Sequence, residues 1–129
     1  MKYLGIDYGR AKIGLALGEI FLAEPYSVIR YTNLDVLIKQ IDGIIQKEKI
    51  VRVVVGVSES KMANQSRDFG DKLNEALNIP VDFQDETLTS HDAQRLAIES
   101  GIGRKKRKGL EDSYAATIML QNYLDSQTT

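Results

Sequence analysis

A run of β-branched side chains near the middle of this 129-residue sequence constrains the fold more than any other feature. Residues 51–57 read Val-Arg-Val-Val-Val-Gly-Val, with almost no alternation between apolar and polar positions. Such a strand is typical of the centre of a parallel sheet, where helices bury both faces. Parallel neighbours need crossover connections, so the run predicts an α/β fold.

The segments before this run predict a hairpin, a third strand and a helix. Residues 2–7 and 13–17 alternate as strands around a short turn, which predicts an antiparallel pair. A third strand is expected over residues 26–31, after Pro25 as a breaker. Apolar residues at helical spacing then predict a helix from Leu34 to Ile45.

The segments after the run predict further helices and one more strand. One helix carries Phe69, Leu73, Ala76 and Leu77 on its apolar face and stops at Asn78. A strand follows over residues 80–84, and a helix opens at Thr89. The last helix is expected to turn these residues inward: Tyr114, Ala115, Ile118, Met119 and Tyr123.

This order of elements predicts an α/β, ribonuclease H-like, mixed five-stranded sheet whose second strand is antiparallel, with helices on both faces. A chain of 129 residues is the usual size of one domain, so residues 1–129 are expected to form a single domain.

Composition narrows the function classes. The chain has no Cys, which excludes disulfides, thiolate catalysis and sulfur-based zinc sites and suits a reducing compartment. Met1 leads directly into a predicted strand, and no apolar run approaches the ~18 residues of a membrane helix. A soluble cytoplasmic protein is expected.

The charges are unevenly distributed. Arg104, Lys105, Lys106, Arg107 and Lys108 follow one another in a glycine-flanked loop. Without them, 12 basic residues face 18 acidic ones, a formal charge of −6. The segment is either a solvated loop or a contact for a polyanion such as nucleic acid.

Three acidic residues fall at the ends of predicted elements. Asp7 ends the first strand, Glu86 follows a later strand, and Asp112 lies near the start of the last helix. Sites in open α/β sheets collect at the carboxyl ends of strands, so these side chains are expected at one rim. Oxygen ligands suit Mg²⁺ or Mn²⁺, and a pair of such ions promotes attack on phosphate. The alternative is solubilising surface charge, and Asp85 and Asp92 fit turn and cap positions.

Several ordered motifs resemble one family. The segments that carry the resemblance are Gly5-Ile6-Asp7-Tyr8-Gly9, Lys12 to Ala16, Pro25, Val54-Val55-Gly56, Asp85 to Ser90, Lys105 to Ala116, and Leu120 to Leu124. Together they resemble the YqgF (RuvX-type) nuclease family over nearly the whole chain.

The resemblance implies a metal-dependent endonuclease in which Asp7, Glu86 and Asp112 are the catalytic ligands of Mg²⁺ or Mn²⁺. It implies action on structured nucleic acid, with maturation of the 5′ end of precursor 16S ribosomal RNA favoured and Holliday-junction resolution in DNA as the alternative.

Two departures from the family pattern concern substrate binding. Residues 58–65 lack the family's Pro-Leu and Asp-Gly pairs, and Thr87 stands where the family carries Arg. Arg grips a phosphate through two parallel hydrogen bonds, which Thr cannot do. These changes are expected to affect substrate binding more than metal binding.

Two other function classes remain open. A non-catalytic nucleic-acid-binding factor for ribosome assembly would keep the same fold without the chemistry. A phosphotransferase of the actin and sugar-kinase type also begins with Asp-x-Gly, but it needs two such domains. Tyr8, beside Asp7, is a candidate for stacking on a base, with a core position as the alternative.

Overall fold

The computed structural model describes residues 1–57, 63–85 and 111–127, and predictions on other residues, including the helix at Thr89, lie outside this part. The elements are β1 (Lys2–Asp7), β2 (Lys12–Glu19), β3 (Leu22–Arg30), α1 (Leu34–Glu48), β4 (Ile50–Val57), α2 (Ala63–Leu77), β5 (Val81–Asp85) and α5 (Glu111–Gln127). None of these helices is long and apolar enough to cross a membrane.

The strands form one five-stranded sheet in the order β3-β2-β1-β4-β5. β2 is antiparallel to β1 and β3, whereas β4 is parallel to both β1 and β5. The predicted mixed sheet with an antiparallel second strand is therefore confirmed. The β-branched run forms β4, and its residues from Val53 to Val57 are buried as expected of a central strand.

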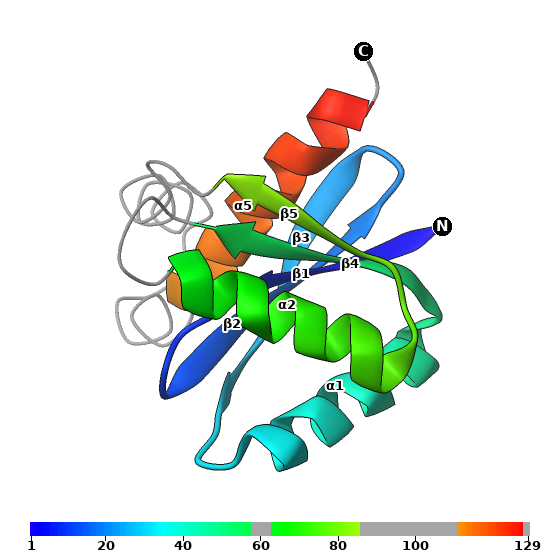
Figure 1. The fold of residues 1–129 in the computed structure, drawn as a ribbon. Coiled ribbons are helices and arrows are strands. Elements are labelled where there is room, and N and C mark those ends of the chain that lie inside the picture. The colour runs from blue at the N-terminus through cyan, green and yellow to red at the C-terminus, as the bar shows by residue number, and fades with distance from the viewer. Residues whose placement is uncertain (58–62, 86–110, 128–129) are drawn as a thin grey trace.

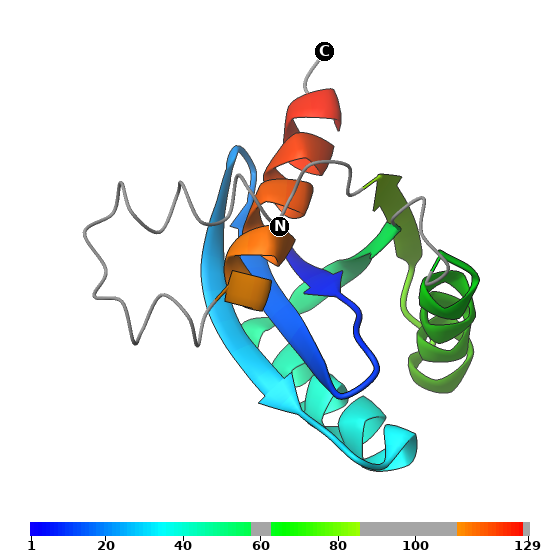
Figure 2. The ribbon, with the colours of Figure 1, turned by 90° about the vertical axis from the view of Figure 1, so that its left-hand side faces the viewer.

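Helices cover both faces of the sheet, as predicted. α1 and α2 lie on one side, and α5 lies on the other (Figures 1 and 2). Strand alternation divides the core between them. On β4, Val53 and Val55 join the core under α1 and α2, whereas Val54 packs beneath α5.

The sequence sets both ends of α1. The side chain of Asn33 accepts a hydrogen bond from the Val36 N–H, and Lys49 ends the helix with a φ of 57°. Four residues of the predicted apolar face are fully within the core: Leu37, Ile38, Ile41 and Ile45. In α2, Phe69 and Leu73 are buried as expected, but the prediction for Ala76 is wrong because that side chain is exposed.

α5 approaches the sheet closely because two strand positions carry glycine. A Cβ atom on Gly5 would lie 2.9 Å from Leu120 Cβ, and one on Gly18 would lie 2.9 Å from Leu120 Cδ2. The predicted inward residues of α5 are buried, except that Ile118 is half-buried. The small residues on this face therefore decide how near α5 lies.

β3 is longer than predicted. It begins at Leu22 and contains Pro25, which pairs with Ala16 next to a register shift. Pro25 does not break the strand because β3 is an edge strand, where a missing N–H is tolerated. α5 supplies partners along this edge: Gln121 accepts from the Ala23 N–H at 2.9 Å and donates to the Phe21 carbonyl at 2.7 Å.

Candidate functional site

Asp7 is the last residue of β1, at the carboxyl end of the parallel part of the sheet. Figure 1 shows the arrowheads of β1, β4 and β5 and the beginning of α5 on the same side of the molecule. The register aligns Ile6 with Val55, and Val55 with Phe83, so the three strands end at similar heights. This is the rim where open α/β sheets form their sites.

The side chain of Asp7 belongs to the sheet face that α5 covers. Leu4 and Ile6 point into the core under α1 and α2, so Tyr3, Gly5 and Asp7 point the other way. The rings of Tyr3 and Tyr123 meet edge to face at 6.2 Å. Gly5, two residues further along β1, meets Leu120, which lies about one helical turn before Tyr123 in α5. β1 and α5 therefore run in opposite directions.

The antiparallel orientation of β1 and α5 places Asp7 near the beginning of α5. The position of a Cβ on Gly5 is 3.4 Å from the Ala116 carbonyl oxygen. Asp7 lies two residues further, a step of about 7 Å along a strand. The same step along a helix is about four to five residues, because each residue rises about 1.5 Å. Counting back from Leu120 and Ala116, the two α5 residues that Gly5 meets, leads to residues 111–116, the first turns of α5, where the backbone of Asp112 lies.

Ser113 fastens that turn to the sheet. Its hydroxyl donates a hydrogen bond to the Leu15 carbonyl at 2.8 Å and accepts one from the Tyr26 N–H at 3.2 Å. Leu15 is the cross-strand partner of Ile6, the residue before Asp7. The sequence analysis did not identify Ser113. Its role follows from its complete burial next to Asp112, which only the structure shows.

The remaining predicted site residues are only partly described. Asp85 ends β5, but Glu86 and the side chain of Asp112 lie outside the described part, as do Arg104, Lys105, Lys106, Arg107 and Lys108. Within the described ranges, no three His, Asp or Glu side chains gather into a metal-binding group. The structure thus brings Asp7 and the backbone of Asp112 to one end of the sheet.

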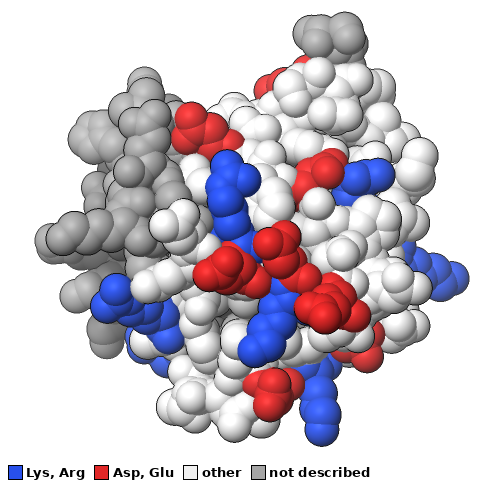
Figure 3. Space-filling view, viewed as in Figure 1, with Lys and Arg blue, Asp and Glu red and all other residues white. Residues whose placement is uncertain are grey.

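A hollow of about 220 Å³ lies beside Asp7 at the loop between β1 and β2. Its described lining includes the basic residues Arg10 and Lys12, and Arg10 is exposed. One acidic and two basic residues therefore contribute to the lining, a set of charges that suits a ligand with both a metal ion and a phosphate. On the face covered by α2, by contrast, acidic and basic side chains are interspersed (Figure 3).

Tyr8 is half-buried: it is one of the residues that line this hollow, and its ring packs against the core under α2. Its ring stacks on Phe69 of α2 with centroids 4.4 Å apart and planes 22° apart. Tyr8 therefore packs in the core, and stacking of its ring on a base stays a prediction.

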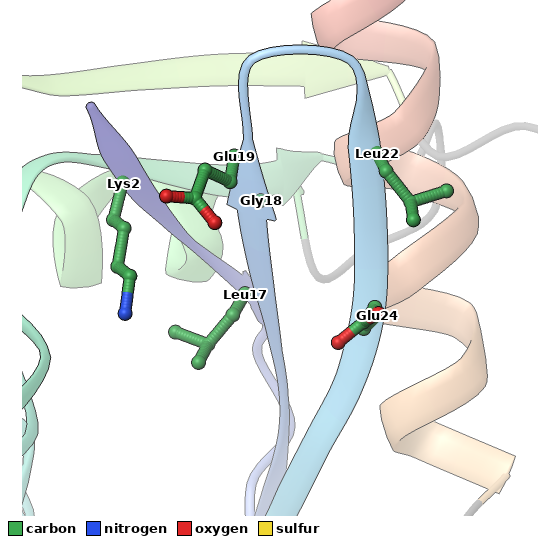
Figure 4. A pocket seen from close by; sticks show the side chains of 6 residues that line it. All are labelled: Lys2, Leu17, Gly18, Glu19, Leu22 and Glu24. Carbon is green, nitrogen blue, oxygen red and sulfur yellow. The ribbon is translucent and has the colours of Figure 1, made fainter.

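A second hollow of about 200 Å³ lies at the other end of β1. Figure 4 shows its lining, which combines Lys2, Glu19 and Glu24 with Leu17, Gly18 and Leu22. It is remote from Asp7 because Lys2 and Asp7 are the two ends of the same strand. It does not belong to the candidate site.

The fold and this rim define the class to which the chain belongs. It superposes on Thermus thermophilus RuvC in complex with a Holliday junction with a TM-score of 0.65, at 14% identity, covering 99% of this chain and 96% of that one. The fowlpox virus resolvase in complex with Holliday junction DNA gives a TM-score of 0.70 at 11% identity, covering 100% of both chains. The chain has the ribonuclease H-like fold of these resolvases.

The chain belongs to the RuvX family, described as Holliday junction resolvase, whose profile matches residues 1–126. A relative from Caldanaerobacter subterraneus subsp. tengcongensis, named "Putative pre-16S rRNA nuclease", is 39% identical over 136 residues, covering 98% of each chain. A protein of the same name from Halothermothrix orenii is 36% identical over 135 residues, covering 98% of this chain and 96% of its own. The predicted family is confirmed.

Proposed function

We propose that this protein is a metal-dependent endonuclease that hydrolyses phosphodiester bonds in structured nucleic acid, with the 5′ end of precursor 16S ribosomal RNA as its substrate. The observation that carries the proposal is the position of Asp7 at the carboxyl end of β1, next to the strand position that Ser113 of α5 binds. The names of the RuvX relatives support the choice of RNA.

Asp7, Glu86 and Asp112 are the residues proposed to hold the metal ions, and their chemistry fits. All three offer carboxylate oxygens, the ligands that Mg²⁺ and Mn²⁺ prefer. When bound, such ions polarise the phosphate and lower the pKa of water, which together favour hydrolysis. Glu86 directly follows Asp85 in the sequence, and Asp85 ends β5 at the same rim of the sheet as Asp7.

The protein's own cations would bind the substrate. Arg10 and Lys12 line the hollow beside Asp7, where they would contact backbone phosphates next to the cleaved bond. The guanidinium of Arg10 offers a forked donor in a chain that has Thr87 where the family carries Arg. Residues 104–108 are proposed to bind more distant phosphates. Precursor ribosomal RNA as substrate fits the expected cytoplasmic location.

The second candidate function is resolution of four-way DNA junctions. The family's description and the junction-bound fold relatives favour it specifically. Both reactions hydrolyse a phosphodiester bond, so the same carboxylates would serve either one. Only the shape and sugar of the substrate separate the two candidates.

A side-by-side cleavage assay tests the proposal. A precursor 16S RNA fragment and a four-way DNA junction are incubated with the protein and Mg²⁺ or Mn²⁺, with a chelator as the zero-metal reference. The variants are Asp7→Asn and, as a matched control, Asp71→Asn, which makes the same change at an exposed position on α2. We expect Asp7→Asn to lose about 100-fold or more in rate, because the ligand charge is removed. Asp71→Asn should retain full activity.

The assay also separates the alternatives. Faster cleavage of the junction than of the RNA would favour the resolvase. Tight binding of the RNA without cleavage at any metal concentration would favour a non-catalytic assembly factor. Full metal-dependent activity in Asp7→Asn would refute the proposed site.

A further inference from the structure

Tyr31, directly after β3, holds the loop that follows Asp7. Its hydroxyl donates a hydrogen bond to the Gly9 carbonyl at 2.5 Å. Its backbone N–H donates to the Ala11 carbonyl at 3.0 Å. One residue next to the end of β3 therefore binds two peptide groups of the connection between β1 and β2.

The aromatic rings hold the same loop from the side of α2. Tyr8 stacks on Phe69, and the ring of Tyr31 lies 6.5 Å from that of Tyr8. All three side chains pack with the core under α1 and α2. Tyr8 directly follows Asp7, the last residue of β1, so the packing of Tyr8 in this core restrains the backbone next to the Asp7 carboxylate.

The loop has little room to adopt another path. A Cβ atom on Gly9 would lie 2.6 Å from the Lys12 carbonyl oxygen, so the backbone at Gly9 passes close to the backbone at Lys12. Burial, with a smaller contribution from Tyr8, raises the pKa of Tyr31 above its ordinary value. The hydroxyl of Tyr31 therefore remains a protonated donor throughout the physiological pH range.

We propose that Tyr31 is a positioning residue for the site at Asp7, whose hydroxyl locks the β1–β2 loop so that the carboxylate faces α5 before metal or substrate binds. The inference deepens the function proposed above and rests on the role of Asp7 in it. Tyr31 acts through its hydrogen bond to the Gly9 carbonyl.

Preorganisation of this kind has a defined signature. A ligand held in place loses little freedom when the ion binds, whereas a mobile ligand must be ordered at that moment. Loss of the Tyr31 hydroxyl should therefore raise the metal concentration needed for half-maximal binding. The rate at saturating metal should change less, because the ordered state is then restored by the ion.

The test uses the full chain and two variants that each lose one tyrosine hydroxyl group. Tyr31→Phe keeps the ring and removes the bond to Gly9. Tyr26→Phe is the matched control, because the Tyr26 hydroxyl donates to Glu48 at 3.3 Å, away from the loop. Two quantities are measured: amide hydrogen exchange of residues 8–12 and 31 without metal, and Mn²⁺ binding followed by electron paramagnetic resonance.

In Tyr31→Phe we expect exchange of these amides to accelerate about 5-fold and the Mn²⁺ midpoint to rise by a similar factor, since one hydrogen bond is lost. Tyr26→Phe should change neither quantity. Equal exchange in the two variants would overturn the inference, whatever the activity. If Asp7→Asn binds Mn²⁺ as the unmodified protein does, the proposed function fails instead, and the exchange data still decide whether Tyr31 orders the loop.

Discussion

Tyr123 joins three elements through a single hydroxyl group. It donates a hydrogen bond from α5 to Asp82 of β5, and Asp82 also pairs with Arg52 of β4 at 2.9 Å. Tyr123 itself is only 7% exposed. Burial, followed by the bond to Asp82, raises the pKa of Tyr123 from 10.0 to about 12.

This shift predicts how stability changes in alkali. A group whose pKa is raised on folding contributes stability that is complete below its unfolded pKa and is lost as pH rises through the folded one. Between about pH 10 and 12, the free energy of unfolding of the unmodified protein should fall by on the order of 2 kcal/mol more than that of Tyr123→Phe. Urea denaturation at intervals across this range measures both slopes. Parallel slopes would show that the Tyr123 hydroxyl does not titrate differently on folding.

Individual residues could be predicted from the sequence only where local pattern decides them. The alternation of residues 2–7 was sufficient to put Asp7 at a strand end on the same face as Gly5. The position of Tyr8 could not be decided in this way, because its stacking partner Phe69 is far away in the chain. Tyr31 has no motif of its own, and its role depends on a contact 22 residues distant.

At the scale of elements, the packing of α5 on a glycine-containing face controls the distance between helix and sheet. Gly5 faces Leu120 and the Ala116 backbone, with no space for a further methyl group. The chain also contains a contrasting glycine, Gly43, which is exposed in α1 and has nothing within 4 Å of a built Cβ. The two positions make a matched pair for one substitution.

Gly5→Ala should destabilise the protein by about 1–3 kcal/mol, because α5 must move away from the sheet or the core must accept overpacking. Gly43→Ala should stabilise it by about 0.5–1 kcal/mol, because glycine costs more backbone entropy in a helix. Urea denaturation of both variants at neutral pH provides the comparison. A change of the same sign at both positions would contradict the close contact described for Gly5.

The errors in predicting elements arose from tertiary contacts. Pro25 was expected to precede the third strand, yet β3 starts at Leu22 because β2 and Gln121 of α5 supply its hydrogen-bond partners. The sequence pattern of residues 51–57 predicted a central strand correctly, because a strand that is buried on both faces is apolar at nearly every position. An edge strand that a distant helix covers has no comparable pattern in its sequence.

At the scale of the whole molecule, charge is the basis for a prediction about substrate affinity. The chain has a formal charge of −1, and −6 without residues 104–108. The acidic remainder repels phosphate, so the basic segment is proposed to provide most of the affinity for nucleic acid. Phosphate contacts release counterions, which makes affinity fall with salt.

Replacing Lys105, Lys106 and Lys108 by Ala should weaken binding to all sequences alike and flatten the dependence on salt. Each lost phosphate contact should reduce the slope of log affinity against log salt by about 0.7 to 0.9. Metal affinity and thermal stability should stay nearly unchanged. Binding titrations at several salt concentrations measure the slope, and an unaltered slope would identify the segment as merely solubilising.

The close fit of α5 has a consequence for biosynthesis. α5 follows all five strands in the chain, so ribosomes complete the sheet before they make the helix that covers one of its faces. At a synthesis rate of about 5–20 residues per second, this face of the sheet stays uncovered for several seconds. Glycine and alanine at positions 5, 16 and 18 give the uncovered face little apolar surface. The unfinished polypeptide thus offers neighbouring nascent chains and chaperones little to bind during translation.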